Sequence, residues 1–325
     1  SKAAICVVVP VYKAMATLDR CVESVLAQQV EGGLTCILVD DGSPDESGAL
    51  CDAWAAKDDR VTVIHQDDLG VSGARNSGLA AADSEFIVFL DSDDALRPGA
   101  LQAALTAQRA APQDFVVWHY TTDEKDPAAV TADAEPRTQA GLARLWLDCL
   151  LAMPWNKLYR ADLAKQLQFD VQYTLGEDLQ FVLDYIALLG QTVPEFGYRV
   201  MTSPLTFYDC SRGGTLSTRY HANYCDIWPK HFAKLNAACH AAACPAEDMR
   251  PLHRAELQVF AEGVADIMRR DPSPTQRLKG YKAEAALRSP WLRALLERMK
   301  IEHCYSAYYL PCRWRNVGLV CRLAN

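Results

Sequence analysis

The sequence lacks any apolar run of the roughly 18–20 residues that a membrane-spanning helix needs. It opens almost directly into a strand-like run, so we expect no signal peptide. Positive charge is scarce, because 33 lysines and arginines stand against 41 acidic residues, and the net charge of -8 excludes a general nucleic-acid binder. The twelve cysteines form no C-x-x-C pair, and the seven histidines show neither H-x-x-x-H nor H-E-x-x-H spacing. We therefore expect free thiols in a reducing, cytoplasmic compartment rather than a disulfide framework or a zinc site.

The first 120 residues alternate strand and helix patterns. Apolar, β-branched runs predict strands at 4–9, 35–39, 61–65, 86–90 and 115–120. Helical spacing between them predicts helices at 17–30, 45–57, 72–82 and 98–110, with Thr17 as a candidate N-cap. Because fully apolar strands separated by helices are buried on both faces, the predicted fold class is α/β, with a mostly parallel sheet flanked by helices.

The pattern changes after residue 120. We expect a polar loop at 121–137, a helix at 139–151, a loop at 153–159, a helix from 177, and strands at 192–200 and 205–208. From about residue 220 the pattern is helical and is interrupted by prolines. We therefore predict one α/β domain at 1–218, with halves at 1–120 and 121–218, and a helical region at 219–325.

Closely spaced aspartates follow one of the predicted strands. Asp91, Asp93 and Asp94 come directly after the apolar run at 86–90, with Ser92 between the first two. Carboxylates this close repel one another, and a hard divalent cation such as Mn²⁺ or Mg²⁺ would offset the repulsion. The alternative is an acidic turn before the next helix. In parallel sheets the strand carboxyl ends are also where ligands bind.

Two further segments belong to the same predicted edge. Asp40 and Asp41, followed by Gly42, end the second strand, where a carboxylate can accept from a ribose hydroxyl or a base N–H; a turn with an N-cap is the alternative. Residues 70–78 form a small-residue loop that runs into a helix, whose first amides and Arg75 could face a diphosphate. This segment is neither a Walker A motif nor a G-x-G-x-x-G fingerprint, and a surface ion pair is the alternative for Arg75.

Four motifs therefore occur in a fixed order: Pro10-Val11-Tyr12, Val39-Asp40-Asp41-Gly42-Ser43, Gly70-x-Ser72-x-Ala74-Arg75-Asn76-x-Gly78 and Leu90-Asp91-Ser92-Asp93-Asp94. In this order and spacing they resemble the bacterial family 2 glycosyltransferases of GT-A fold, which act in capsule, exopolysaccharide or cell-wall glycan synthesis. The resemblance is close over residues 4–120 and looser to about residue 218.

The resemblance implies a set of donor contacts: Pro10, Val11, Tyr12, Asp41, Arg75, Asp91, Ser92, Asp93, Thr215 and Ser217. The first three would line the nucleotide pocket, and Asp41 would contact the base. Asp91 and Asp93 would form the D-x-D motif that holds Mn²⁺ or Mg²⁺ on the diphosphate of a UDP-sugar. Arg212 would neutralise charge on the leaving diphosphate; a plain hairpin turn is the alternative for its segment.

On the acceptor side, Glu177 and Asp178 open a predicted helix after Gly176 and resemble the family's Glu-Asp pair. The resemblance implies that Asp178 is the general base and that Glu177 supports it, while the alternative is that both acids favour a positive helix N-terminus. Trp155, Asn156 and Lys157 resemble an acceptor-binding segment, although Trp155 would also suit a protein core.

The implied activity is inverting, metal-dependent transfer of a sugar to a saccharide or lipid-linked saccharide. Two alternatives stay open: a metal-dependent nucleotidyl- or phosphotransferase, and a non-catalytic module that binds a nucleotide sugar.

Residues 276–325 carry ten lysines and arginines against three glutamates, with aromatic residues among them. This basic tail predicts peripheral contact with the cytoplasmic face of a membrane, and the alternative is a basic face that packs on the acidic domain.

Overall fold

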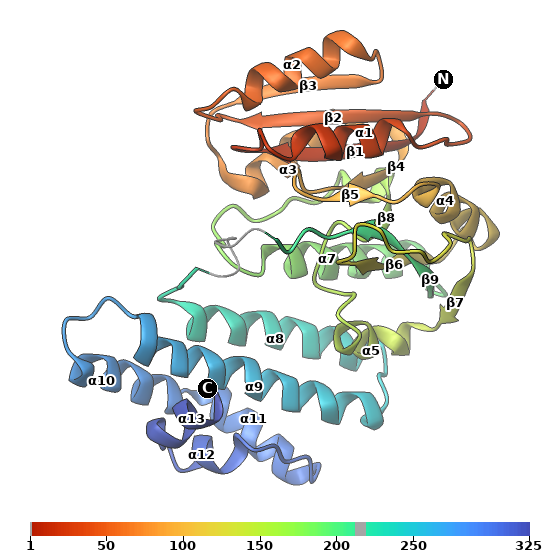
Figure 1. Cartoon of the computed structure of the whole chain (residues 1–325). Helices are drawn as coiled ribbons and strands as arrows, with labels where there is room; N and C mark the ends of the chain where they lie inside the picture. The colour runs from red at the N-terminus through yellow and green to blue at the C-terminus, as the bar shows by residue number, and fades with distance from the viewer. Residues whose placement is uncertain (1, 212–218) are drawn as a thin grey trace. The chain divides into compact units, whose positions relative to one another are not determined.

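The structure, a computed structural model, describes residues 2–211 and 219–325 (Figure 1). The chain divides into two compact units. Unit 1 comprises Ser1–Gly141 and Leu150–Arg212, and unit 2 comprises Leu142–Cys149 and Gly213–Asn325. The short helix α5 (Leu142–Leu147) therefore groups with the C-terminal helices. The boundary near residue 218 that the sequence suggests stays a prediction.

One sheet organises unit 1. In the described part of the chain nine strands form it, in the order β3-β2-β1-β4-β8-β6-β9-β5, with β7 paired to β9. Their bounds are β1 Ala3–Val11, β2 Leu34–Asp41, β3 Val61–Gln66, β4 Ser84–Phe89, β5 Ala95–Leu96, β6 Phe115–Thr121, β7 Ala134–Arg137, β8 Lys157–Arg160 and β9 Tyr198–Phe207. The strands β3, β2, β1 and β4 are mutually parallel, while β8 runs antiparallel to both β4 and β6. The predicted α/β class is confirmed.

Helices of unit 1 connect these strands. They are α1 Leu18–Leu26, α2 Ser47–Lys57, α3 Gly70–Ala81, α4 Ala100–Ala110, η1 Gln139–Gly141, α6 Ala161–Ala164 and α7 Glu177–Thr192. Thr17 occupies the N-cap position of α1, as predicted, although its side chain makes no capping hydrogen bond. Gly78 lets α3 lie directly on the sheet, since a β-carbon there would collide with Val8 of β1. This close packing sets the distance between α3 and the sheet.

Three strand predictions in the second half need correction. The strand β8 lies where we expect a loop, because its four residues include Lys157 and show no apolar alternation. The strand β9 is continuous where we expect two pieces. Pro204 interrupts the apolar pattern, but it falls beside a register shift between β6 and β9, where a strand tolerates a missing N–H donor. The strand β7 lies inside the predicted loop at 121–137.

Unit 2 is helical, as the sequence predicts. Besides α5 it contains α8 Tyr224–Ala241, α9 Ala246–Arg270, α10 Gln276–Leu287, α11 Pro290–Ile301, α12 Tyr309–Arg313 and α13 Val317–Leu323. In Figure 1, α8 lies along one side of α9, and α11, α12 and α13 lie on the other. Leu257, Phe260, Leu292 and Met299 are among the buried residues of its core. No helix within residues 2–211 and 219–325 combines the length and apolar character that crossing a membrane requires.

Candidate functional site

Polar side chains gather where the parallel strands end. Val11, the last residue of β1, is in register with Asp40 of β2, so Tyr12 and Asp41 leave neighbouring strands at the same edge. The next strand on the other side, β4, ends at Phe89, two residues before Asp91. Strand direction therefore brings the three sequence motifs together at the carboxyl edge of the sheet, as the sequence predicts.

Arg75 connects two aspartates that lie far apart in the sequence. Its Nη2 donates to Asp91 Oδ1 at 2.9 Å, and its Nη1 donates to Asp178 Oδ1 at 2.6 Å. The guanidinium is buried over the ring of Phe169, with its carbon 5.3 Å from the ring centroid. The chain around Phe169 is held in turn by Asn76, whose amide exchanges two hydrogen bonds with the backbone of Phe169. Residues from α3, from the end of β4 and from the start of α7 thus form one network.

The charges in this network shift each other's ionisation. Burial raises the pKa of Asp178 to about 7; Arg75 opposes this rise, and Glu177 and Asp91 add to it. Burial alone would lower the pKa of Arg75, but the carboxylates of Asp178 and Asp91 raise it, so the guanidinium stays charged. About a third of each aspartate side chain remains exposed, at 29% for Asp91 and 31% for Asp178. Solvent or a ligand can therefore reach both carboxylates.

The aspartate motif itself contains one buried and two accessible carboxylates. Asp91 and Asp93 are half-buried, whereas Asp94 is fully buried. Asp94 Oδ1 accepts from the backbone N–H of Asp209, while its Oδ2 has no hydrogen-bond partner in the described part of the chain. Burial, reinforced by Asp91, raises the pKa of Asp94 to about 8. Several carboxylate oxygens beside an unpartnered one form a donor set that suits a hard divalent cation.

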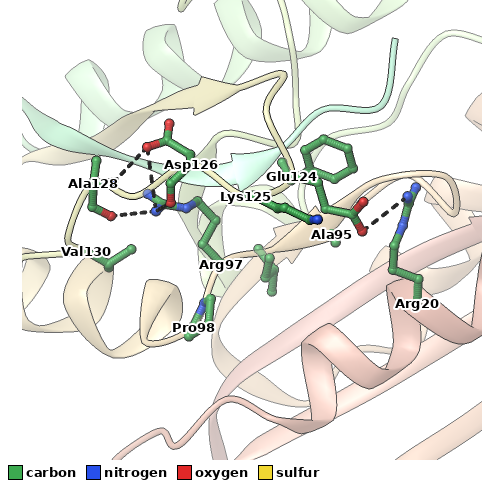
Figure 2. A pocket seen from close by; sticks show the side chains of 11 residues that line it. Arg20, Ala95, Arg97, Pro98, Glu124, Lys125, Asp126, Ala128 and Val130 are labelled. Atoms are coloured by element: carbon green, nitrogen blue, oxygen red, sulfur yellow. Dashed lines mark hydrogen bonds and ion pairs between the residues drawn. The ribbon is translucent and has the colours of Figure 1, made fainter. Parts of the chain in front are cut away.

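Arg20 of α1 holds the backbone of the aspartate motif in place. No sequence pattern predicts this role. Arg20 Nη2 donates to the backbone carbonyl of Asp93 at 2.5 Å and to Asp209 Oδ2 at 2.6 Å. The partners are 73 and 189 residues away along the chain, so no local pattern could reveal them. Figure 2 shows Arg20 at one end of a pocket of about 490 Å³, where it points toward Glu124. At the other end Arg97 donates to the carbonyl oxygens of Asp126 and Ala128.

The residues predicted to contact the nucleotide differ in how much of each is exposed to solvent. Tyr12 is 45% exposed, whereas Pro10 and Val11 are buried in β1. Asp41 is buried too, and its Oδ1 accepts from Gln66 Nε2 at 2.7 Å and from the N–H of Leu69 at 2.9 Å. Asp41 therefore ties the end of β2 to the loop before α3.

Gly42, which follows Asp41, has a φ of +68°, and a β-carbon there would lie 2.9 Å from the backbone nitrogen of Asp68. The turn that brings this loop against β2 therefore requires glycine, as the sequence suggests. Beside it, Asp40 is held by His65, whose Nδ1 lies 3.0 Å from its Oδ2.

The segment predicted to bind the acceptor is buried in unit 1. Trp155 is 4% exposed, and its ring stacks on Tyr208 with 5.3 Å between centroids. Asn156 and Lys157 are fully buried. The ammonium of Lys157 donates to the carbonyl oxygens of Leu150 and Met153 and to Asn156 Oδ1. With every polar atom committed to the protein, Asn156 and Lys157 hold the loop before β8 and offer no surface to a sugar.

The other predicted residues fall into two groups. Glu177 lies half-buried at the start of α7, directly after Gly176, whose φ of +77° turns the chain into the helix. Arg212, Thr215 and Ser217 lie outside the described residues.

Comparison with known proteins relates this chain to glycosyltransferases. Residues 6–168 match the family described as Glycosyl transferase family 2. The chain is 39% identical over 124 residues to Glycosyltransferase GlyG of Streptococcus pneumoniae, which covers 38% of this chain and 41% of that protein. It is 31% identical over 211 residues to Succinoglycan biosynthesis protein ExoO of Rhizobium meliloti, which covers 59% of this chain and 58% of that protein. The chain spans about half the length of the curated relatives it matches.

Solved structures resemble nearly the whole chain at lower identity. S. aureus TarS 1-349 in complex with UDP-GlcNAc aligns with a TM-score of 0.63 and 15% identity, covering 99% of this chain and 90% of that chain. Mannosyltransferase PcManGT from Pyrobaculum calidifontis, in complex with GDP-Man and Mn2+, aligns with a TM-score of 0.54 and 17% identity, covering 100% of this chain and 87% of that chain. At such identity the likeness establishes the fold, and the predicted GT-A architecture is confirmed.

Proposed function

Because this chain belongs to glycosyl transferase family 2, we propose that it transfers a sugar, with inversion, from a nucleotide-diphosphate donor to a saccharide or lipid-linked saccharide hydroxyl. The observation that carries the proposal is the bridge from Asp91 through Arg75 to Asp178. This bridge connects the aspartate motif, which suits a donor diphosphate and its metal ion, to the accessible carboxylate of Asp178 on α7. A UDP-sugar is the proposed donor.

On the donor side, Pro10, Val11 and Tyr12 are proposed to line the site of the nucleotide; the Tyr12 ring is exposed, whereas Pro10 and Val11 are buried in β1. Asp41, which accepts from the N–H of Leu69 and so holds the loop before α3, is proposed to lie next to the base. Asp91 and Asp93 would hold Mn²⁺ or Mg²⁺, with Ser92 between them. When bound, the ion supplies positive charge that stabilises the departing diphosphate. Arg212, Thr215 and Ser217 are proposed to contact the same diphosphate on sequence grounds.

On the acceptor side, Asp178 is the proposed general base. Its carboxylate takes the proton of the acceptor hydroxyl as that oxygen forms a bond to the anomeric carbon. The bond from the anomeric carbon to the diphosphate oxygen breaks at the same time, and its electron pair leaves with the nucleoside diphosphate. Attack opposite the leaving group inverts the anomeric centre. Glu177, one residue away, is proposed to bind an acceptor hydroxyl.

Arg75 acts as a positioning residue in this proposal. It holds the Asp178 carboxylate by one oxygen, Oδ1, at 2.6 Å, which leaves Oδ2 for the acceptor proton. It also keeps Asp91 at a fixed place relative to Asp178. The sequence predicts that Arg75 lies near the donor. We propose in addition that Arg75 links the donor-side Asp91 to the acceptor-side Asp178.

A panel of nucleotide sugars, incubated with the full chain and either Mn²⁺ or a chelator, tests this function. We expect at least one UDP-sugar to give free UDP in the presence of Mn²⁺, and we expect the chelator to abolish this release. The matched control is Asp93→Asn, in which donor turnover should fall by at least tenfold. Release of inorganic pyrophosphate would instead support a nucleotidyltransferase, and binding without turnover of any donor would support a non-catalytic module.

The pH dependence of transfer reports on Asp178. Because its pKa is raised to about 7, the carboxyl is protonated below that pH and cannot accept a proton. We expect kcat to be constant above about pH 8 and to fall about tenfold for each pH unit well below 7. The residual activity of Asp178→Asn should lack this acidic limb. A wild-type kcat that stays flat down to about pH 5.5 would contradict the assignment.

Peripheral membrane contact is proposed for the stretch of chain at 300–315 in unit 2. Ile301, Tyr305, Leu310 and Trp314 are exposed there, at 78%, 50%, 48% and 63%. Arg313 lies between Leu310 and Trp314, and Lys300 and Arg315 flank the four residues, so the stretch combines apolar insertion with attraction to anionic lipid. Removing residues 276–325 would not be a clean test, because buried residues such as Leu292 and Met299 belong to the core of unit 2.

Surface substitutions provide the sharper test. We expect Lys300→Glu/Arg315→Glu to lower sedimentation with phosphatidylglycerol vesicles by roughly tenfold or more, since each basic residue near an anionic surface is worth about 1 kcal/mol. Vesicles of phosphatidylcholine should bind neither protein. The control variant Arg109→Glu/Lys125→Glu makes the same charge change on exposed residues of unit 1. Equal sedimentation of both variants with wild type would remove the membrane proposal.

A further inference from the structure

Unit 2 contains a cluster of metal-ligand side chains that the proposed transfer reaction does not use. His253 comes from α9, while Glu302 and Cys304 follow the end of α11. One possible ligand atom from each lies within 4.8 Å of the other two. Glu302 Oε2 is 2.7 Å from His253 Nδ1 and 3.5 Å from Cys304 Sγ. His253 and Cys304 are each 1% exposed, so the cluster is part of the interior.

Hydrogen bonding decides which nitrogen of His253 carries a proton. Its Nε2 lies 3.2 Å from Asn236 Oδ1. The orientation of that amide is fixed, because Asn236 Nδ2 donates both to the carbonyl of Phe232 and to Glu256 Oε1. An oxygen acceptor therefore faces Nε2, which must donate. In a neutral ring Nδ1 is then a lone pair, directed at the carboxylate oxygen of Glu302.

The lone pair of His253 Nδ1 and the carboxylate oxygen Oε2 of Glu302 are 2.7 Å apart and would repel each other. A positive charge must therefore lie between or beside these two atoms. Either a second proton or a metal ion can supply it. The arrangement around Nε2 matches the usual support of a metal-binding histidine, in which the ring nitrogen that does not bind the ion donates to a fixed oxygen. Cys304 Sγ donates to the same oxygen, Glu302 Oε2, at 3.5 Å, so its sulfur converges on the pair as a third possible ligand.

A second buried acid supports the same ring. Glu256 is fully buried, and its Oε2 has no hydrogen-bond partner among the described residues. Asn236 links Glu256 to His253, so this carboxylate belongs to the support of the same ring.

We propose that His253, Glu302 and Cys304 bind a zinc ion that fastens α9 to the segment after α11. Imidazole nitrogen, carboxylate oxygen and thiolate sulfur are the ligands zinc takes in proteins, and three of them leave a fourth position for water. The sequence hides this site, since His253 and Glu302 are 49 residues apart and no zinc spacing links them. The proposal departs from the expectation, drawn from spacing alone, that the chain has no zinc site.

Metal analysis of the full chain tests the proposal without reference to transfer activity. After purification from zinc-supplemented medium, we expect about one equivalent of zinc, and we expect the thermal midpoint to fall when a chelator removes it. Cobalt added to the stripped protein should give a thiolate-to-cobalt charge-transfer band. The aspartate motif of unit 1 offers only oxygen and cannot produce that band.

Matched variants separate this site from nonspecific effects. Cys304→Ser should lose the cobalt band, whereas Cys312→Ser, a control at another buried cysteine of unit 2, should retain it. Asn236→Leu removes the acceptor at Nε2 and should weaken zinc binding by about 10–100-fold. A wild-type protein with no zinc, no cobalt band and no thermal response to zinc would overturn the proposal and leave a buried His253–Glu302 ion pair. A band of equal strength in Cys304→Ser would overturn it as well.

Discussion

Replacing Asp178 with asparagine is expected to lower kcat by roughly 10²–10⁴-fold, the range that general-base catalysis contributes. Asparagine has nearly the same shape, and its Oδ1 can still accept from Arg75 Nη1, so the network should stay folded. The amide cannot accept the acceptor proton. Donor binding should change little, because the donor-side residues are on other elements. The measurement is kcat and KM for the donor at saturating acceptor, with UDP affinity by calorimetry.

Glu177→Gln is the matched control for this prediction. It makes the same chemical change one residue earlier on α7, at a carboxylate that Arg75 does not contact. We expect a smaller loss, seen mainly in the KM for the acceptor. If Asp178→Asn retained near-normal transfer, or if Glu177→Gln were the more damaging change, Asp178 would not be the base.

Arg75→Met should damage both stability and transfer. The substitution keeps the aliphatic part of the side chain but leaves the Asp91 and Asp178 carboxylates without their shared cation. Breaking a buried ion pair from one side costs about 3–5 kcal/mol. Because solvent reaches both carboxylates, we expect the free energy of unfolding of unit 1 to fall by about 3 kcal/mol, at the lower end of this range. Transfer should fall by at least tenfold, with donor and acceptor KM both affected.

Two comparisons make this prediction specific. Arg60→Met removes a 40% exposed arginine from its pair with Asp58, and such surface pairs contribute about 0–1 kcal/mol. The double variant Arg75→Met/Asp178→Asn should recover part of the lost stability, because one of the two repelling charges is gone. It should not recover transfer. Absence of any stability recovery in the double variant would show that packing, and not charge, is what Arg75 supplies.

The sequence was sufficient for the elements whose pattern is local. The buried strands β1, β2, β4 and β6 are built on apolar runs, and helices such as α1 repeat their apolar residues on one face. The strand β8 could not be found this way, because it includes Lys157 and is a strand only by virtue of β4 and β6 on either side. A buried lysine is stable there because three oxygens accept from its ammonium.

Composition and motif order thus determine much about this protein: an α/β sheet of GT-A type, the family, and the edge of the sheet at which Asp91 and Asp93 lie. These follow from local pattern, because strand direction alone decides which loops meet. Tertiary structure decided what the side chains touch. Only folding places Arg75 between Asp91 and Asp178, sets Arg20 against the carbonyl of Asp93, and encloses Asn156 and Lys157. These contacts join residues from 16 to 103 positions apart, and the distances that govern charge and hydrogen bonding exist only once the chain is packed.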